Sequence, residues 1–291
     1  MRLAFLGTPE VAVAPLRALV DAGHDVALVV SRPDKRRGRG ATLLPSPVKA
    51  AAQELGLPVT DKVDDVLGVG ADLGVVVAYG RLIKPPVLAE VPMVNLHFSL
   101  LPRWRGAAPV ERAILAGDQV TGVCVMALEE GLDTGPVYAC VEHPIGPDDT
   151  LDELRSALSA EGTALLVRLL DEGLPEPTAQ VGEPTYAAKI EPGEHQLDWS
   201  RPAEHLHRVV RLGRAWTTFR GKRLLVPRAA LAAVEGRGLA PGQVDPSTLA
   251  VGTGGGGALT LVEVQPEGKP VQAAASWRNG ARLAPGDRLG T

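Results

Sequence analysis

The feature that most constrains the fold is an alternation of short apolar runs with stretches of helical pattern over residues 1–200. Such alternation is typical of a parallel sheet covered by helices. The run 73–78 is apolar throughout, as expected for a strand buried on both faces. We therefore predict an α/β fold with a Rossmann-like, mainly parallel sheet and flanking helices. Its expected strands are 3–6, 26–30, 73–78, 93–98, 123–128 and 137–141.

The pattern changes beyond about Glu172, where prolines recur and little regular structure is expected. Farther on, short alternating runs separated by turn signals occupy 223–226, 242–244, 249–251 and 259–264. This spacing is typical of a small all-β barrel. We therefore divide the chain into a first domain, 1–189, a linker, 190–207, and a second domain, 208–291.

Bulk properties narrow the class of protein. The net charge of −4 argues against a surface that is basic all over, but it allows a local basic patch that engages phosphates. The two cysteines, Cys124 and Cys140, are too few for a disulfide framework or a zinc knuckle, and we expect both to be small core residues. The amino terminus enters an apolar strand directly, and no apolar run approaches the ~20 residues of a membrane span. We expect a soluble, cytoplasmic protein.

The most informative stretch surrounds Asn95 and His97, near the end of an expected strand. Residues two apart in a strand point to the same face, so these side chains should project side by side. The carboxyl ends of parallel strands are where open α/β sheets place their ligands. An amide and an imidazole together can stabilise negative charge that develops on a carbonyl oxygen.

A second stretch places Asp133 between Gly131 and Gly135, in a loop that can bring a carboxylate close to a substrate. A carboxylate beside His97 would hold the ring and raise its affinity for a proton. Each residue also has a plainer interpretation when taken alone. His97 could be a satisfied structural histidine, Asn95 could cap a strand end, and Asp133 could make an Asx-turn.

Three motifs occur together: NLHFSLLP at 95–102, RGAAP at 105–109 and LDTG at 132–135. This combination closely resembles the methionyl-tRNA formyltransferase family, and the resemblance covers almost all of 1–190. The Asn-x-His core with a distant aspartate is shared by folate-dependent formyltransferases in general. It therefore specifies the reaction more strongly than the acceptor.

The resemblance implies a role for each matching residue. Asn95 and His97 would stabilise the oxyanion formed when an amine attacks a formyl carbon, and Asp133 would orient or charge His97 and help the proton leave. The donor would be 10-formyltetrahydrofolate, consumed as a co-substrate, and no metal would be needed. The family's folate-binding loop corresponds here to Ser99, Leu100, Leu101 and Pro102.

Two features favour initiator methionyl-tRNA as the acceptor. Residues 32–40 hold five cations and one anion in a glycine-containing loop, where the family places a tRNA contact. We assign that contact to Arg36, Arg37 and Arg39. The family also carries an oligonucleotide-binding (OB)-like barrel at the position of 208–291, a common nucleic-acid platform. On this interpretation 1–189 is the catalytic domain, the barrel binds tRNA, and the protein works as a monomer. The plainer alternative is that these cations are only solvated.

Three other classes of protein share parts of this pattern. A nicotinamide-dependent oxidoreductase would need a three-glycine turn, whereas the first strand is followed by Gly7 alone. A related formyltransferase acting on a sugar amine or a purine precursor would share the same catalytic core. A non-catalytic RNA-binding module would leave the joint occurrence of Asn95, His97 and Asp133 without a reason.

Overall fold

The computed structural model describes residues 1–37, 42–232 and 238–291. The chain forms two compact units. The first unit comprises Met1–Arg112, Gln119–Ile145 and Leu154–Lys189, and the second comprises Ala113–Asp118, Gly146–Glu153 and Ile190–Thr291.

The first unit is built on a seven-stranded sheet with the order β10-β9-β7-β6-β1-β2-β5. Neighbouring strands from β7 to β5 run parallel, whereas β9 is antiparallel to both β7 and β10. The expected Rossmann-like, mainly parallel sheet is confirmed. Its strands are β1 (Arg2–Gly7), β2 (Asp25–Val30), β5 (Val59–Thr60), β6 (Leu73–Val77), β7 (Met93–His97), β9 (Val120–Ala127) and β10 (Val137–Pro144).

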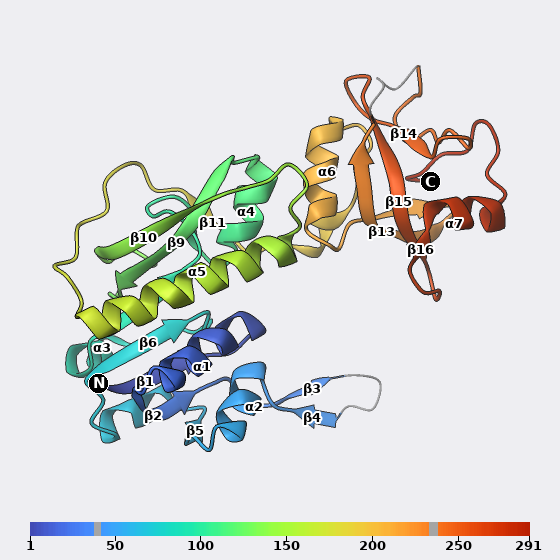
Figure 1. Cartoon of the computed structure of the whole chain (residues 1–291). Coiled ribbons are helices and arrows are strands. Elements are labelled where there is room, and N and C mark those ends of the chain that lie inside the picture. Colours follow the sequence, from blue (N-terminus) through green and yellow to red (C-terminus); the bar gives the residue numbers. More distant parts are fainter. Residues whose placement is uncertain (38–41, 233–237) are drawn as a thin grey trace. The chain divides into compact units, whose positions relative to one another are not determined.

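Helices accompany the sheet between its strands. Figure 1 shows α1 and α2 beside β1 and β2. The start of α2 follows from its sequence, because the Ser46 side chain accepts a hydrogen bond from the Lys49 amide and Pro47 occupies the first turn. The helices are α1 (Val13–Asp21), α2 (Pro47–Glu54), α3 (Pro85–Glu90), α4 (Pro109–Ala116) and α5 (Leu151–Glu172), with short 3-10 turns at Glu10–Ala12 and Val63–Gly68.

The long helix α5 packs closely on the antiparallel part of the sheet (Figure 1). A Cβ atom at Gly162 would lie only 2.8 Å from Val123 Cγ2 and 3.1 Å from Leu96 Cδ1. A glycine is therefore required where helix and sheet approach each other. Because successive side chains of a strand point to opposite faces, Asn95 and His97 project from the face opposite to Leu96 and α5.

The described part of the basic stretch 32–40, which ends at Arg37, differs from the flexible loop that we expected. Residues Lys35–Arg37 form β3, which pairs in antiparallel fashion with β4 (Thr42–Leu44). Backbone pairs join Arg36 to Leu43 and Arg37 to Thr42. The third arginine of the expected tRNA contact, Arg39, lies outside the described residues.

The two cysteines correct a second expectation. Cys124 on β9 and Cys140 on β10 face each other in the antiparallel ladder, with Cα atoms 4.1 Å apart, and form a disulfide. Cys124 is fully buried, but Cys140 is exposed. The expectation of two small core residues was therefore wrong for Cys140, and it missed the bridge, because the pairing depends on the register of two strands.

The second unit contains a curled antiparallel sheet with the order β12-β13-β15-β14, and β16 pairs with β15. Single bridges from Val244 to Val251, from Gln243 to Arg288 and from Phe219 to Leu289 link its two edges. The expected small all-β domain is thus confirmed, and its sheet is curled into a half-barrel. Its strands are β12 (Trp216–Phe219), β13 (Lys222–Leu231), β14 (Ala250–Gly252), β15 (Ala258–Pro266) and β16 (Gln272–Ala273).

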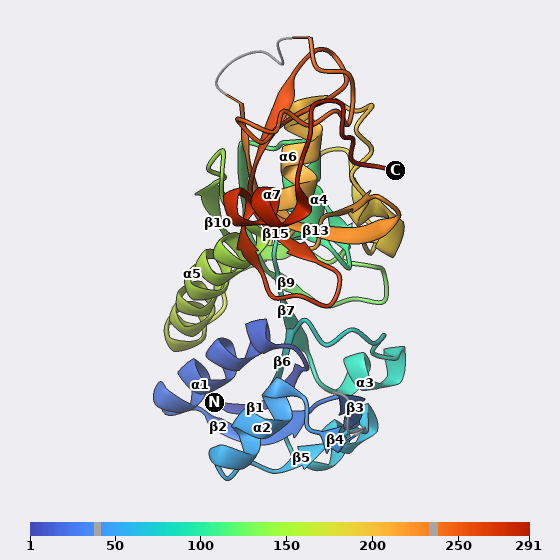
Figure 2. The same ribbon diagram turned by 90° about the vertical axis from the view of Figure 1, so that its right-hand side faces the viewer.

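Two helices close the second unit. Helix α6 (Ala203–Arg211) contacts β13 and β15, and α7 (Ala274–Ala281) contacts β15 and β16 (Figure 2). The expected linker 190–207 contains a 3-10 turn, Pro192–His195, and the start of α6. Leu197, Trp199 and Leu206 of this range are at least 95% buried in the core of the second unit. The range is therefore packed structure and not a free spacer.

Among the helices of the described ranges, none combines the length and the apolar character that a membrane span requires.

A small β-bridge in the first unit joins two segments that matter for the site. Residues Arg105–Gly106 form β8 and pair in parallel with Tyr186–Ala187, which form β11. This pairing fixes the segment around 180 beside the segment around 105.

Candidate active site

The end of β7 brings Asn95 and His97 to one face of the sheet. Both are buried, with 9% and 5% of their surface exposed. They pair across the ladder with Met126 and Cys124 of β9, so β9 flanks them on one side. The sequence-based expectation that the two side chains project side by side agrees with this register.

The segment that follows β7 folds back over the histidine. The Ser99 hydroxyl donates to the Arg103 carbonyl at 2.6 Å, and the Leu101–Pro102 peptide bond is cis. The Trp104 carbonyl lies 2.9 Å from His97 Nε2. Because a carbonyl oxygen only accepts, Nε2 carries a hydrogen and donates it, which leaves Nδ1 to face the site.

Asp133 reaches the same place from the loop between β9 and β10. Its φ angle of +50° lies in the left-handed region, which costs a non-glycine residue about 1–2 kcal/mol. Its Oδ2 atom accepts a 2.7 Å hydrogen bond from the Gly106 amide. The carboxylate is 12% exposed, so water reaches it only in part.

The structure brings Asn95, His97 and Asp133 together as a cluster. Asp133 Oδ1 is 3.5 Å from Asn95 Nδ2, and its Oδ2 is 3.7 Å from His97 Nδ1. Both separations exceed that of a good hydrogen bond, so the amide and the imidazole can turn to a ligand atom. The cluster offers an amide donor, a ring nitrogen that can carry a proton, and a carboxylate that stabilises the charged ring.

The expected folate-binding segment has a mixed character. Ser99 is fully buried and its hydroxyl bonds within the segment, so it shapes the turn. Leu100, Leu101 and Pro102 are half-buried. Leu100 packs over β9, where a Cβ atom at Gly122 would lie 2.5 Å from Leu100 Cδ2. The backbone of Arg36 and Arg37 belongs to β3, on a hairpin separate from this cluster in the sequence and in the sheet order.

Two residues beside the cluster, Gln180 and Arg105, were not predicted from the sequence. The Gln180 amide nitrogen donates to the carbonyls of Asp133 and Gly135, at 2.8 Å each. Its oxygen accepts from Nε and Nη2 of Arg105 at 3.1 and 2.6 Å. Arg105 stood in a motif without an assigned role, and Gln180 lies in the proline-rich stretch where no periodic pattern pointed to it.

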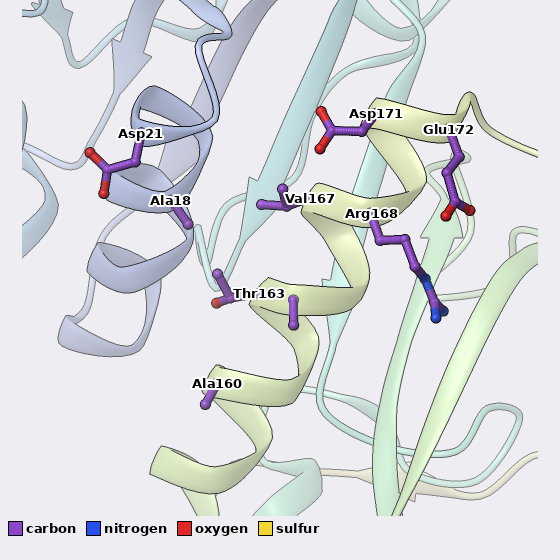
Figure 3. A pocket seen from close by; sticks show the side chains of 9 residues that line it. Ala18, Asp21, Ala160, Thr163, Val167, Arg168, Asp171 and Glu172 are labelled. Atoms are coloured by element: carbon purple, nitrogen blue, oxygen red, sulfur yellow. The ribbon is translucent and has the colours of Figure 1, made fainter.

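A groove of about 590 Å³ lies elsewhere, between α1 and α5 (Figure 3). Figure 3 shows Val167 and Asp171 of α5 pointing toward α1. Mostly small and acidic side chains line it, and none of the cluster residues does. Its lining lacks the convergent amide, imidazole and carboxylate, so the Asn95 cluster is the candidate active site. The lining residues are Ala18, Asp21, Ala160, Thr163, Ala164, Val167, Arg168, Asp171 and Glu172.

Comparison with known families settles the kind of protein. Residues 1–170 match the family model described as formyl transferase, and residues 189–282 match the model of the formyl transferase C-terminal domain. The chain belongs to the formyl transferase family. The Asn95 cluster lies inside the first of these matches.

Individual relatives refine this assignment. The chain is 45% identical to the methionyl-tRNA formyltransferase of Roseobacter denitrificans, over 98% of each chain. It resembles the solved methionyl-tRNA formyltransferase of Clostridium thermocellum with a TM-score of 0.58 at 16% identity, over 80% of this chain and 94% of that one. A Helicobacter canadensis N-formyltransferase, solved with folinic acid and dTDP-3-aminofucose, gives a TM-score of 0.71 at 16% identity, over 91% and 98%. The two structural likenesses concern the fold alone.

Replacement of Asp133 by asparagine tests the cluster. Asp133→Asn keeps the size and an acceptor for the Gly106 amide but removes the negative charge 3.7 Å from His97. We expect kcat for formyl transfer to fall by about 100-fold or more, the usual scale for loss of proton-transfer catalysis, with an altered pH–rate profile. Asp64→Asn, on the exposed surface of the same unit, is the matched control and should match the wild type. An Asp133→Asn profile with unchanged height and shape would make Asp133 a turn residue only.

Proposed function

We propose that this protein transfers the formyl group of 10-formyltetrahydrofolate to the α-amino group of initiator methionyl-tRNA. One observation carries the proposal: the 45% identity to a methionyl-tRNA formyltransferase extends over 98% of both chains, so it includes the second unit as well as the cluster. We further propose that the protein works in the cytoplasm as a monomer, with Asn95, His97 and Asp133 as the catalytic residues.

The cluster suits the chemistry of formyl transfer. An α-amino group has a pKa of about 8, so a substantial fraction is neutral at physiological pH, and no strong base is needed to create a nucleophile. When bound, 10-formyltetrahydrofolate supplies the formyl carbon. The residues must then position the amine, stabilise negative charge on the formyl oxygen and remove a proton.

Each residue takes one of these tasks. Asn95 Nδ2 donates a hydrogen bond to the formyl oxygen as it gains negative charge. His97 acts through Nδ1, because its Nε2 already donates to the Trp104 carbonyl, and a ring protonated at Nδ1 donates to the same oxygen. Asp133 stabilises the charged ring and accepts the amine proton, directly or through one water. A proton is then delivered to N10 of the folate as the bond between N10 and the formyl carbon breaks, so tetrahydrofolate leaves and the new amide remains on the acceptor. The half-buried Leu100, Leu101 and Pro102 provide an apolar wall for the folate.

The acceptor is the part of the proposal that a competition experiment decides. The purified protein is given 10-formyltetrahydrofolate with methionyl initiator tRNA, glycinamide ribonucleotide or a dTDP-linked amino sugar, and kcat/KM is measured for each. We expect methionyl-tRNA to be preferred by at least ~100-fold, because only the tRNA can use a second, phosphate-binding domain. Preference for either small acceptor would refute the tRNA assignment while it leaves formyl transfer intact.

We propose that Arg36, Arg37 and Arg39 contact tRNA phosphates. Each phosphate contact that is lost should lower the log–log salt slope of tRNA binding by roughly 0.7 to 0.9. The triple alanine variant is therefore expected to bind tRNA weakly, with a flatter response to salt, and to bind folate like the wild type. Binding titrations at several salt concentrations measure this. Unchanged tRNA affinity and slope would show that these cations are only solvated.

A further inference from the structure

The side chain of Gln180 joins two elements of the site that are far apart in the sequence. Its amide nitrogen donates to the carbonyls of Asp133 and Gly135, both at 2.8 Å, and its oxygen accepts two hydrogen bonds from Arg105. The nitrogen and the oxygen of this half-buried carboxamide therefore make two hydrogen bonds each. Such complete pairing restricts the side chain to a single orientation.

The partners also dictate the residue type. Arg105 offers only donors, and the two backbone carbonyls offer only acceptors, so the bridging side chain must accept at one end and donate twice at the other. A primary amide does this, whereas a carboxylate lacks donors and an ammonium lacks acceptors. A glutamate at position 180 could pair with Arg105, but it would turn a negative oxygen toward two carbonyl oxygens.

The hydrogen bonds of Gln180 act on the backbone of the loop that carries the carboxylate. Asp133 has a φ of +50°, a conformation that an aspartate adopts only at a cost. Its carbonyl is held by Gln180 and its Oδ2 by the Gly106 amide. Gly135 anchors the same loop against β9, where a Cβ atom would lie 2.0 Å from the Ala127 carbonyl oxygen.

Arg105 connects the hydrogen bonds of Gln180 to the segment that orients His97. It lies in β8, directly before Gly106, and its amide donates to the Thr185 carbonyl at 2.9 Å. Trp104, the preceding residue, supplies the carbonyl that orients His97. The short segment 104–106 therefore contacts all three groups: Trp104 bonds to the ring of His97, Gly106 to the carboxylate of Asp133, and Arg105 to the amide of Gln180.

We infer that Gln180 is a positioning residue for formyl transfer, because its carboxamide, held by Arg105, fixes the backbone of Asp133 and so the distance of the carboxylate from Asn95 and His97. The inference rests on the proposed function. Gln180 acts through Asp133, and therefore it contributes to the rate of the chemical step and not to substrate affinity.

Two variants of Gln180 test this in the full-length protein. Gln180→Glu keeps the size and the pairing with Arg105 but loses both donors, and Gln180→Met keeps the length without polar atoms. We expect kcat to fall by roughly 10- to 100-fold in both, since a displacement of ~1 Å can cost about 100-fold. KM for 10-formyltetrahydrofolate and for methionyl-tRNA should stay within about 3-fold, because neither substrate has to touch Gln180. Gln53→Glu, the same change on the exposed surface of α2, is the matched control.

A double-mutant cycle separates positioning from a general structural role. Gln180→Met is combined with Asp133→Asn, and kcat is compared for the four proteins. If Gln180 acts through Asp133, it should have less than about a 3-fold effect once the carboxylate is gone, because residues that act as a unit are not additive. Effects that multiply would overturn the inference, as would a wild-type kcat in a folded Gln180→Met protein.

Measurements on the wild type distinguish a failure of the proposed function from a failure of the positioning role. If the wild type does not formylate methionyl-tRNA, the proposed function fails. If it does, and Gln180→Glu and Gln180→Met both keep its kcat with an unchanged thermal unfolding temperature, the positioning role fails. Should Gln180→Glu unfold because of its partly buried charge, Gln180→Met alone tests the positioning role.

Discussion

The close packing of α5 on β7 and β9 is the constraint on which the site depends. Gly162 leaves room for Leu96 and Val123 against the helix, so one face of these strands is taken by the core. The alternation of side chains then leaves Asn95 and His97 on the other face. Burial of the apolar residues of β7 therefore determines the face of the sheet to which Asn95 and His97 point. No bond between these two side chains is needed for this.

The second requirement is a carboxylate that arrives from another part of the chain. Asp133 belongs to a loop in a costly backbone conformation, and hydrogen bonds from Gly106 and Gln180 hold it there. Three segments meet at this point: 95–106, 131–135 and 178–187. Backbone hydrogen bonds join 95–106 to 178–187, and the side chains of Asp133 and Gln180 join 131–135 to both, whereas the contacts of Asp133 with Asn95 and His97 stay long. Hydrogen bonds thus hold the three segments together, and Asn95, His97 and Asp133 keep hydrogen-bonding capacity for a ligand.

Short-range patterns in the sequence predicted the features that depend on residues close together in the chain. Apolar periodicity gave the sheet, and the two-residue spacing of Asn95 and His97 gave their shared face. Asp133 could be joined to them only through the family resemblance, because nothing local states which strand ends are neighbours.

The features that were not predicted all depend on residues that are far apart in the sequence. The Cys124–Cys140 bridge depends on the register of β9 and β10, and the packing of Trp199 depends on a core assembled from distant strands. Gln180 lies in a stretch without periodicity, and it acquires a role only when β8 and β11 pair.

The measurement that tests the account most directly is the single-turnover rate of formyl transfer by Asn95→Ala and His97→Ala, with both substrates saturating. We expect a rate at least ~100-fold below the wild type in each, the usual scale for loss of a preorganised oxyanion donor, with folate still bound and the fold intact. A near-normal single-turnover rate in either variant would contradict it, because the face selected by the packing of α5 would then not be the one that carries the chemistry.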